Sequence, residues 1–142
     1  MAALVQALQQ APTAAMAFCR SKLIDQNDKY LGDDYVIREP AFRRACQADT
    51  LISGPQMTRF LMHSCVIPNL SAALFRRDAL LAESGFSAAY RVCCDWDLFF
   101  RLTRQHDVAY VATPMNLFRQ HETTIRSTTR ERDIYAEYFR LL

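Results

Sequence analysis

The sequence predicts an α/β layered domain, because continuously apolar segments of strand length alternate along the chain with segments of helical periodicity. Its 142 residues fit a single domain covering residues 1–142, and 51% of them are hydrophobic, which is enough to form a core. Three glycines and five prolines exclude a low-complexity chain. The net charge of +2 does not indicate a nucleic-acid partner, because the basic residues are interleaved with acidic ones and form no dense cluster.

The helices are predicted from apolar side chains that recur every three or four residues. Residues 1–10 show this pattern up to Pro12, which cannot continue a helix. Residues 55–64, 95–105 and 127–142 show it as well, and a short helix at 78–83 ends before Gly85. The residues that define the apolar faces are Ala3, Leu4, Leu8 and Ala11; Met57, Phe60, Leu61 and Ser64; Leu98, Phe99 and Leu102; and Ile134, Tyr138 and Leu141.

The strands are predicted from short apolar runs bounded by turn-forming residues. These runs are residues 14–21, 72–75, 108–111 and 115–119. Turn-forming residues occupy 25–28 and 68–71, which predicts a turn before Tyr30 and a loop before the second strand. The polar stretch 32–44 has no pattern that favours a helix or a strand.

The five cysteines predict free thiols in a reducing compartment. Their number is odd, no Cys-x-x-Cys pair occurs, and no spacing is typical of a zinc site. Cys65 near His63 is the one arrangement that suggests a Cys–His nucleophile, although closeness in sequence is weak support for it.

Two further observations concern location. No segment approaches the ~18 apolar residues that cross a bilayer, and residues 1–10 lack the charged start and the cleavage pattern of a signal peptide. We therefore expect a cytoplasmic protein, either free or at the inner face of a membrane.

The acidic and aromatic triplet Asp95-Trp96-Asp97 opens the helical pattern at 95–105. Asp95 is expected in or just before the first turn, where the positive end of the helix dipole suits a carboxylate. A carboxylate fixed in this way by a buried helix can act as a general base. The alternative is an ordinary N-cap aspartate.

Four segments carry further motifs: residues 14–32 (AAMAFCRSKLIDQNDKYLG), 69–77 (NLSAALFRR), 84–102 (SGFSAAYRVCCDWDLFFRL) and 108–121 (VAYVATPMNLFRQH). In this order they resemble the C-terminal, acceptor-side half of a family 2 glycosyltransferase with the GT-A fold. The resemblance implies a partial GT-A-like layered domain, with a small mixed sheet and flanking helices. It also implies that the N-terminal nucleotide-binding βαβ region is lacking.

The resemblance assigns roles to two neighbouring residues. Asp95 matches the aspartate that takes the proton from the acceptor hydroxyl, although this chain has Cys94 where the family usually has glutamate. Trp96 matches an aromatic position that stacks on a sugar ring. The alternative for Trp96 is a partly buried tryptophan of the core.

The resemblance also implies binding residues outside this helix. Asn69 and Ser71 are expected to bind the acceptor or donor sugar, or else to form a turn. Arg119 is expected to pair with a phosphate or a carboxylate. His121 lies where some relatives place a metal ligand or a diphosphate contact, the alternative being a structural histidine. Arg76 and Arg77 are expected at a solvated strand end.

The metal-binding Asp-x-Asp motif of this fold is not found in the sequence. Asp95 and Asp97 have the right spacing, but residues i and i+2 of a helix point about 200° apart and cannot readily hold one ion. Asp33 and Asp34 lack a preceding buried strand. The complete enzyme would use a divalent metal, Mg²⁺ or Mn²⁺, whereas this chain alone is expected to bind none.

The implied function is transfer of a sugar, with inversion, from a nucleotide-sugar donor to a sugar or lipid-linked acceptor. Because the donor half would be missing, we expect no activity from this chain alone. An unpaired sheet edge would remain, so homo-oligomers through that edge are expected. The alternative is a non-catalytic ligand-binding or scaffolding module derived from the same fold.

Overall fold

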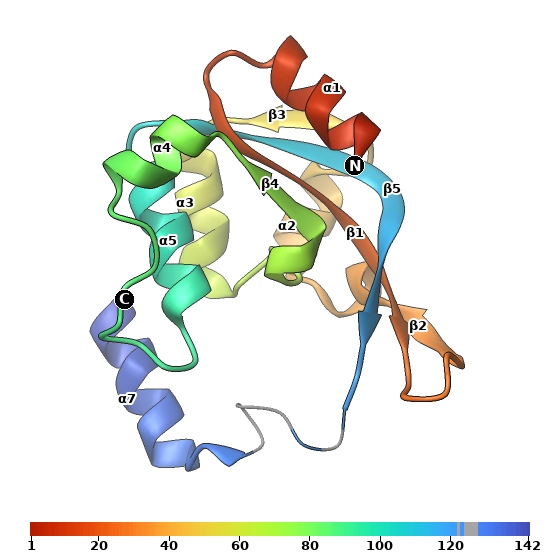
Figure 1. The fold of residues 1–142 in the computed structure, drawn as a ribbon, viewed down its shortest axis with the longest axis vertical. Coiled ribbons are helices and arrows are strands. Elements are labelled where there is room, and N and C mark those ends of the chain that lie inside the picture. The colour runs from red at the N-terminus through yellow and green to blue at the C-terminus, as the bar shows by residue number, and fades with distance from the viewer. Residues whose placement is uncertain (122, 124–127) are drawn as a thin grey trace.

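The computed structural model describes residues 1–121, 123 and 128–142 as an α/β structure, a five-stranded mixed sheet flanked by helices (Figure 1). Among these residues the helices are α1 (Ala2–Gln10), α2 (Pro40–Ala45), α3 (Gly54–His63), α4 (Arg77–Ala82), α5 (Cys94–Thr103) and α7 (Glu131–Leu141), with two 3₁₀ helices, η1 (Asp34–Ile37) and η2 (Leu70–Ala72). The strands are β1 (Ala14–Ile24), β2 (Tyr30–Asp33), β3 (Thr50–Ile52), β4 (Ala73–Phe75) and β5 (Asp107–Arg119). The predicted α/β class is confirmed.

The centre of the sheet is the parallel pair of β1 and β5. Cys19 pairs with Val111 and Ser21 pairs with Asn116, so β5 advances five residues while β1 advances two. The prediction of two strands, 108–111 and 115–119, was therefore wrong. Polar Thr113 and Pro114 interrupt the apolar pattern, but the chain stays extended, and an irregularity in the register absorbs the extra residues.

The remaining strands are antiparallel to this central pair. The strand order is β2-β1-β5-β3. β4 and β2 pair with the same edge of β1: β4 pairs with Met16–Phe18, and β2 pairs further along the strand, at Lys22–Ile24. β3 pairs with Val108–Tyr110 of β5. The sheet thus ends in β3 on one side, and in the short strands β4 and β2 on the other.

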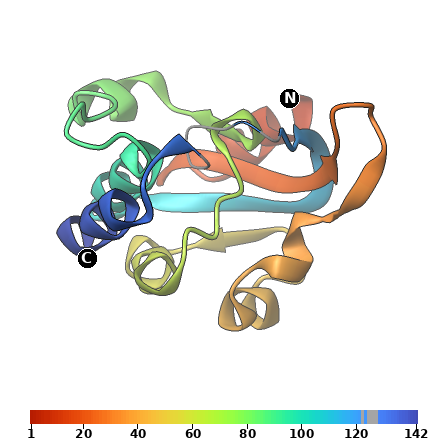
Figure 2. The ribbon, with the colours of Figure 1, turned by 90° about the horizontal axis from the view of Figure 1, so that it is seen from below.

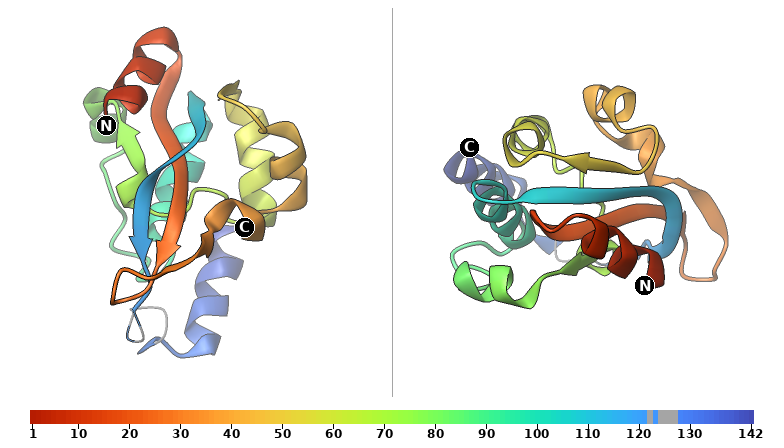
Figure 3. Two further views of the ribbon diagram at one scale, coloured as in Figure 1. Left: turned by 90° about the vertical axis from the view of Figure 1, so that its right-hand side faces the viewer. Right: turned by 90° about the horizontal axis from the view of Figure 1, so that it is seen from above.

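The two faces of the sheet are covered by different helices. α2 and α3 lie on one side of the sheet and α1 lies on the other (Figures 2 and 3), while Ala79 and Leu80 of α4 pack against the same core as α3 and α5. Side chains of β1 and β5 that face α2, α3 and α5 form the larger core, whereas smaller ones pack under α1. The larger core includes Met16, Phe18, Val108, Tyr110, Phe42, Met57, Leu61, Leu98, Phe99 and Leu102; the smaller one includes Leu4, Leu8, Ala17, Cys19, Ala109 and Val111.

Most predicted helices are confirmed to within two residues at each end. Gly85 ends the segment after α4 as expected, with a positive φ of 67° and its N–H donating to the carbonyl of Leu80. The last helix begins at Glu131, and its expected start at Ser127 lies outside the described residues. The expected loop 68–71 instead runs into the 3₁₀ helix η2.

The stretch 32–44, for which no structure was predicted, contains η1 and α2. α2 is only six residues long and buries a single residue, Phe42, so it shows no apolar periodicity. Its start depends on Pro40 in the first turn and on Glu39, whose carboxylate accepts the N–H of Phe42 at 2.7 Å.

Candidate functional site

The candidate base Asp95 lies in the first turn of α5 and is partly exposed. Its Oδ1 accepts the N–H of Trp96 at 2.8 Å. Cys93 occupies the N-cap position and offers no side-chain cap, so Asp95 is not the N-cap residue, although its carboxylate does satisfy a backbone N–H at the helix start. Fully buried Leu98, Phe99 and Leu102 hold the helix against the core.

The start of α5 lies toward the carboxyl end of the parallel strands. A short turn, residues 104–106, joins α5 to β5, so the two elements run in opposite directions (Figure 1). The 10 residues of α5 span about 15 Å, whereas the 13 residues of β5 span about 43 Å. The start of α5, with Asp95, is therefore displaced from the amino end of β5 in the direction in which β5 runs, by about one third of the length of β5.

Trp96 is part of the core. It is 8% exposed, and its indole Nε1 donates to the carbonyl of Leu61 at 3.1 Å. Its ring stacks on Phe100 and meets the ring of Tyr138 edge to face, with centroids 5.4 Å apart. The expected stacking on a sugar ring is therefore not supported, because protein atoms already cover the ring, and the alternative of a core tryptophan agrees with the structure.

Glu137 of α7 was not predicted from the sequence as a residue near this site. Its carboxylate accepts the backbone N–H groups of Arg91, Val92 and Cys93 at 2.9, 2.8 and 2.9 Å. Burial alone would raise the pKa of Glu137, but these hydrogen bonds to the charged form outweigh burial and hold the pKa below its ordinary value. No local spacing could have revealed this role, because Glu137 follows the residues it binds by more than 40 positions.

Asn69 and Ser71 meet Ser21 and Asn116 in one hydrogen-bonded cluster. Asn69 is the N-cap of η2 and accepts the N–H of Ala72 at 3.0 Å, which agrees with the turn-forming alternative. Asn116 donates to Ser21 Oγ at 2.8 Å and to Asn69 Oδ1 at 3.2 Å. Ser71 Oγ lies within hydrogen-bond distance of Asn69 Oδ1 and of Asn116 Oδ1, and its single proton is shared between these two acceptors. The cluster joins η2 to β1 and β5, and Asn116 was not predicted as one of its members.

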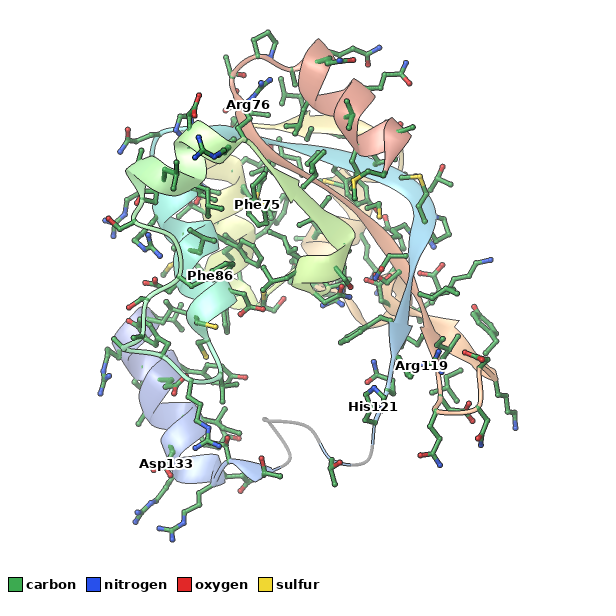
Figure 4. The ribbon with its side chains drawn as sticks, viewed as in Figure 1. Phe75, Arg76, Phe86, Arg119, His121 and Asp133 are labelled. Carbon is green, nitrogen blue, oxygen red and sulfur yellow. The ribbon has the colours of Figure 1, made fainter. Side chains whose placement is uncertain are left out.

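Arg119 pairs with a carboxylate, and that carboxylate belongs to the same chain. It donates to Asp28 Oδ1 at 2.6 Å and to the carbonyl of Asp25 at 2.8 Å, so it holds the turn between β1 and β2. His121 is exposed and follows Arg119 at the end of β5 (Figure 4). Within the described residues, no group of three His, Cys, Asp or Glu side chains is placed to hold a metal ion.

The expectation that Arg76 is solvated was wrong. Its guanidinium donates to the carbonyls of Leu8 at 2.6 Å, Ala14 at 2.8 Å and Ala11 at 3.3 Å, and so ties the end of α1 to the start of β1. Arg77, its neighbour, is exposed as expected. Figure 4 shows Arg76 beside the α1–β1 connection.

Asp97 and Asp34, two further carboxylates considered above as metal ligands, form ion pairs within the chain. Asp97 pairs with Arg101 one helical turn later, at 2.9 Å. Asp34 is 2% exposed, accepts the N–H of Ser21 at 2.7 Å and pairs with Arg38 at 3.2 Å. Burial raises the pKa of Asp34 despite these partners.

All five cysteines are free thiols, as predicted. Burial raises the pKa of Cys46 to about 11, and it raises the pKa of Cys19 and of Cys94 as well. Such thiols are poor nucleophiles. Cys65 donates to the carbonyl of Ile67, while His63 is exposed at the end of α3, so the structure offers no support for a Cys–His nucleophile.

A groove of about 590 Å³ opens at the amino ends of β1 and β5, away from Asp95. It is lined by Pro12, Ala14, Arg76–Ala79, Ala82, Gln105 and His106. Asp95 is not among these residues, so this groove is not the acceptor site expected at Asp95.

Comparison of the sequence with protein-family models and with curated proteins gives no match. The likeness to family 2 glycosyltransferases thus rests on the four segments described above. Within the described part of the chain, no helix has both the length and the apolar character needed to cross a membrane.

Proposed function

We propose that this chain is the acceptor-side part of an inverting glycosyltransferase, and that Asp95 is its general base. The observation that carries the proposal is the position of Asp95. A partly exposed carboxylate stands in the first turn of a helix whose other face is fully buried, at the end of α5 that is far from its junction with β5. The ordered resemblance of four segments to family 2 enzymes supports the same assignment.

The proposed reaction is a single displacement. The Asp95 carboxylate accepts the proton of an acceptor hydroxyl as that oxygen attacks the anomeric carbon of a nucleotide-activated sugar. The bond from the anomeric carbon to the diphosphate breaks, the nucleoside diphosphate leaves with the bonding electrons, and the configuration inverts. The positive end of the α5 dipole favours the charged carboxylate that acts as the base.

In this proposal a divalent metal would be bound by the complete enzyme and not by this chain alone. Among the described residues, no group of three His, Cys, Asp or Glu side chains is placed to hold Mg²⁺ or Mn²⁺, and His121 is exposed two residues past the end of β5. No step assigned to this chain therefore depends on a metal ion. Donor binding is assigned to a region outside these 142 residues.

A second candidate is a non-catalytic ligand-binding or scaffolding module of the same fold. It is favoured by one observation: Trp96, Asn69 and Arg119, which were expected to bind substrate, are engaged in contacts within the chain. In that case Asp95 would have no role in chemistry.

Two measurements separate the candidates. The first is the coding sequence upstream of Met1, where a strand-ended Asp-x-Asp motif is expected for the enzyme. The second is sugar transfer by the complete protein from a panel of nucleotide-sugars. Asp95→Asn should lower kcat by about 100-fold or more, because general-base catalysis contributes that much.

Asp97→Asn is the matched control, since it changes the same residue type two positions later. Equal activity of the Asp95→Asn and Asp97→Asn variants would overturn the assignment of the base. Sugar binding without turnover by the complete protein would support the second candidate. This chain alone is expected to show no turnover of any nucleotide-sugar, and measurable turnover would contradict the missing donor half.

A further inference from the structure

The carboxylate of Glu137 in α7 accepts hydrogen bonds from three consecutive backbone amides just before α5. Glu137 Oε1 accepts the N–H of Arg91, and Glu137 Oε2 accepts those of Val92 and Cys93, all within 2.8–2.9 Å. Successive amides that converge on one anion form a nest, and hydrogen bonds to an ionised acceptor are stronger than neutral ones. Cys93 is both the last of the three and the N-cap residue of α5.

The start of α5 depends on this contact because its own sequence supplies little. The N-cap residue Cys93 makes no side-chain cap, and residues 86–93 before it form no helix or strand. By contrast, Asn69, Ser53 and Glu39 cap their own helices with a side-chain oxygen. Glu137 thus supplies, from another helix, the acceptor that fixes the backbone just before Asp95.

A second contact of α7 lies directly after Asp95. Tyr138, the neighbour of Glu137, packs edge to face on Trp96, whose indole N–H is anchored to Leu61. Leu141 packs against the larger core one turn further along α7. Asp95 therefore lies between Cys93, which Glu137 holds, and Trp96, which Tyr138 contacts.

We propose that Glu137 is a positioning residue for Asp95, acting through the backbone amides of Arg91, Val92 and Cys93. The inference rests on the proposed function in that Asp95 is taken as the base. Its structural part, that Glu137 sets the conformation of the first turn of α5, is measurable whether or not the protein transfers sugars.

The test uses NMR on this chain with Glu137→Gln, which keeps the length of the side chain and one acceptor oxygen but removes the charge. Glu131→Gln is the matched control, an exposed glutamate in the first turn of the same helix. Amide hydrogen exchange at Arg91–Cys93 should become at least about tenfold faster in Glu137→Gln than in the control, since bonds to a charged acceptor are lost. The side-chain carboxyl carbon signal of Asp95 should move as well.

Two further readouts distinguish positioning from a general loss of structure. Trp96 is the only tryptophan, so its fluorescence reports the contact between α5 and α7, and it should shift in Glu137→Gln and not in Glu131→Gln. In Glu137→Ala, added acetate should restore the Asp95 signal by occupying the nest. Glu137→Asp, which keeps the charge on a shorter side chain, serves if Glu137→Gln does not fold, and it should also move the Asp95 signal.

An unchanged Asp95 signal in the Glu137 variants would overturn the proposal, even if the three amides exchanged faster. Where the complete protein transfers sugar, Glu137→Gln should lower kcat and leave KM unchanged. If the wild-type protein transfers nothing, the proposed function fails, while the NMR result still decides whether Glu137 positions Asp95.

Discussion

Arg76 and Arg77 are adjacent arginines that the fold uses differently, and replacing each with alanine tests that difference. Arg76→Ala removes the hydrogen bonds to the carbonyls of Leu8, Ala11 and Ala14, which join α1 to β1. The last turn of α1 contains no basic residue of its own. We therefore expect Arg76→Ala to loosen α1 from the sheet, and Arg77→Ala to have almost no effect.

The size of the effect follows from the contacts. A hydrogen bond from a charged donor contributes about 1.5–3 kcal/mol, and a cation at the end of a helix adds about 0.3–1 kcal/mol. The bonds to Leu8 and Ala14 are short, at 2.6 and 2.8 Å, whereas the bond to Ala11 is 3.3 Å. Because one partly exposed guanidinium makes all three, they do not add fully, and we expect a loss of about 2–4 kcal/mol.

The assay is urea unfolding of Arg76→Ala, Arg76→Lys and Arg77→Ala, followed by circular dichroism and by Trp96 fluorescence. Arg77→Ala should stay within about 0.5 kcal/mol of wild type. Arg76→Lys keeps the charge without the planar fork and should recover only part of the loss. Amide exchange should rise in α1 of Arg76→Ala. Equal stability of the Arg76→Ala and Arg77→Ala variants would refute the reasoning.

Four other results are expected. Gly54→Ala should lower the free energy of unfolding by about 1–3 kcal/mol in urea titrations, because a Cβ there would lie 2.3 Å from the carbonyl oxygen of Thr103; unchanged stability would contradict that contact. Tyr110→Phe should be neutral or stabilising by up to about 1 kcal/mol in the same titrations, since among the described residues its buried hydroxyl finds no hydrogen-bond partner; a marked loss would reveal a missing partner. The pKa of Glu137 is lower in the folded state than its value near 4.5 in the unfolded chain. The ionised carboxylate therefore stabilises the fold at pH values above 4.5, and this stabilisation is lost as the pH falls through the folded-state pKa. Acid unfolding curves of wild type and Glu137→Gln should accordingly converge at low pH. Light scattering should show association that increases with concentration, through the sheet edges at β3 or β4; a clean monomer at high concentration would count against it.

The contrast between Phe42 and Leu98 shows where sequence reasoning succeeds. Leu98, Phe99 and Leu102 repeat at helical spacing, and α5 was predicted with its buried face. Phe42 is as buried as Phe99 to within one per cent, but it stands alone in a six-residue helix. Its burial comes from the aromatic rings of Phe18, Phe60 and Tyr110, which belong to other elements. A single apolar residue carries no period, so no local pattern could indicate that helix.

The candidate site divides in the same way. The place of Asp95 in the first turn of α5 followed from residues 95–102 alone. The hydrogen-bond partners of Trp96, Arg76 and Arg119 could not be predicted from local sequence, since each partner is a carbonyl or carboxylate at least 35 residues away. Side chains of these types suit a ligand and a protein partner equally well, and only folding shows which partner is near.

The amino-acid sequence by itself determined the alternation of helices and strands, the free thiols and the carboxylate at the start of α5. These features depend on the spacing of neighbouring residues along the chain. The tertiary structure alone decided that β5 is one continuous strand, that Arg76 secures α1, and that Glu137 holds the backbone ahead of Asp95. Each of these depends on groups that are distant in sequence and meet only when the sheet and its helices have packed, so it leaves no periodic trace in the chain.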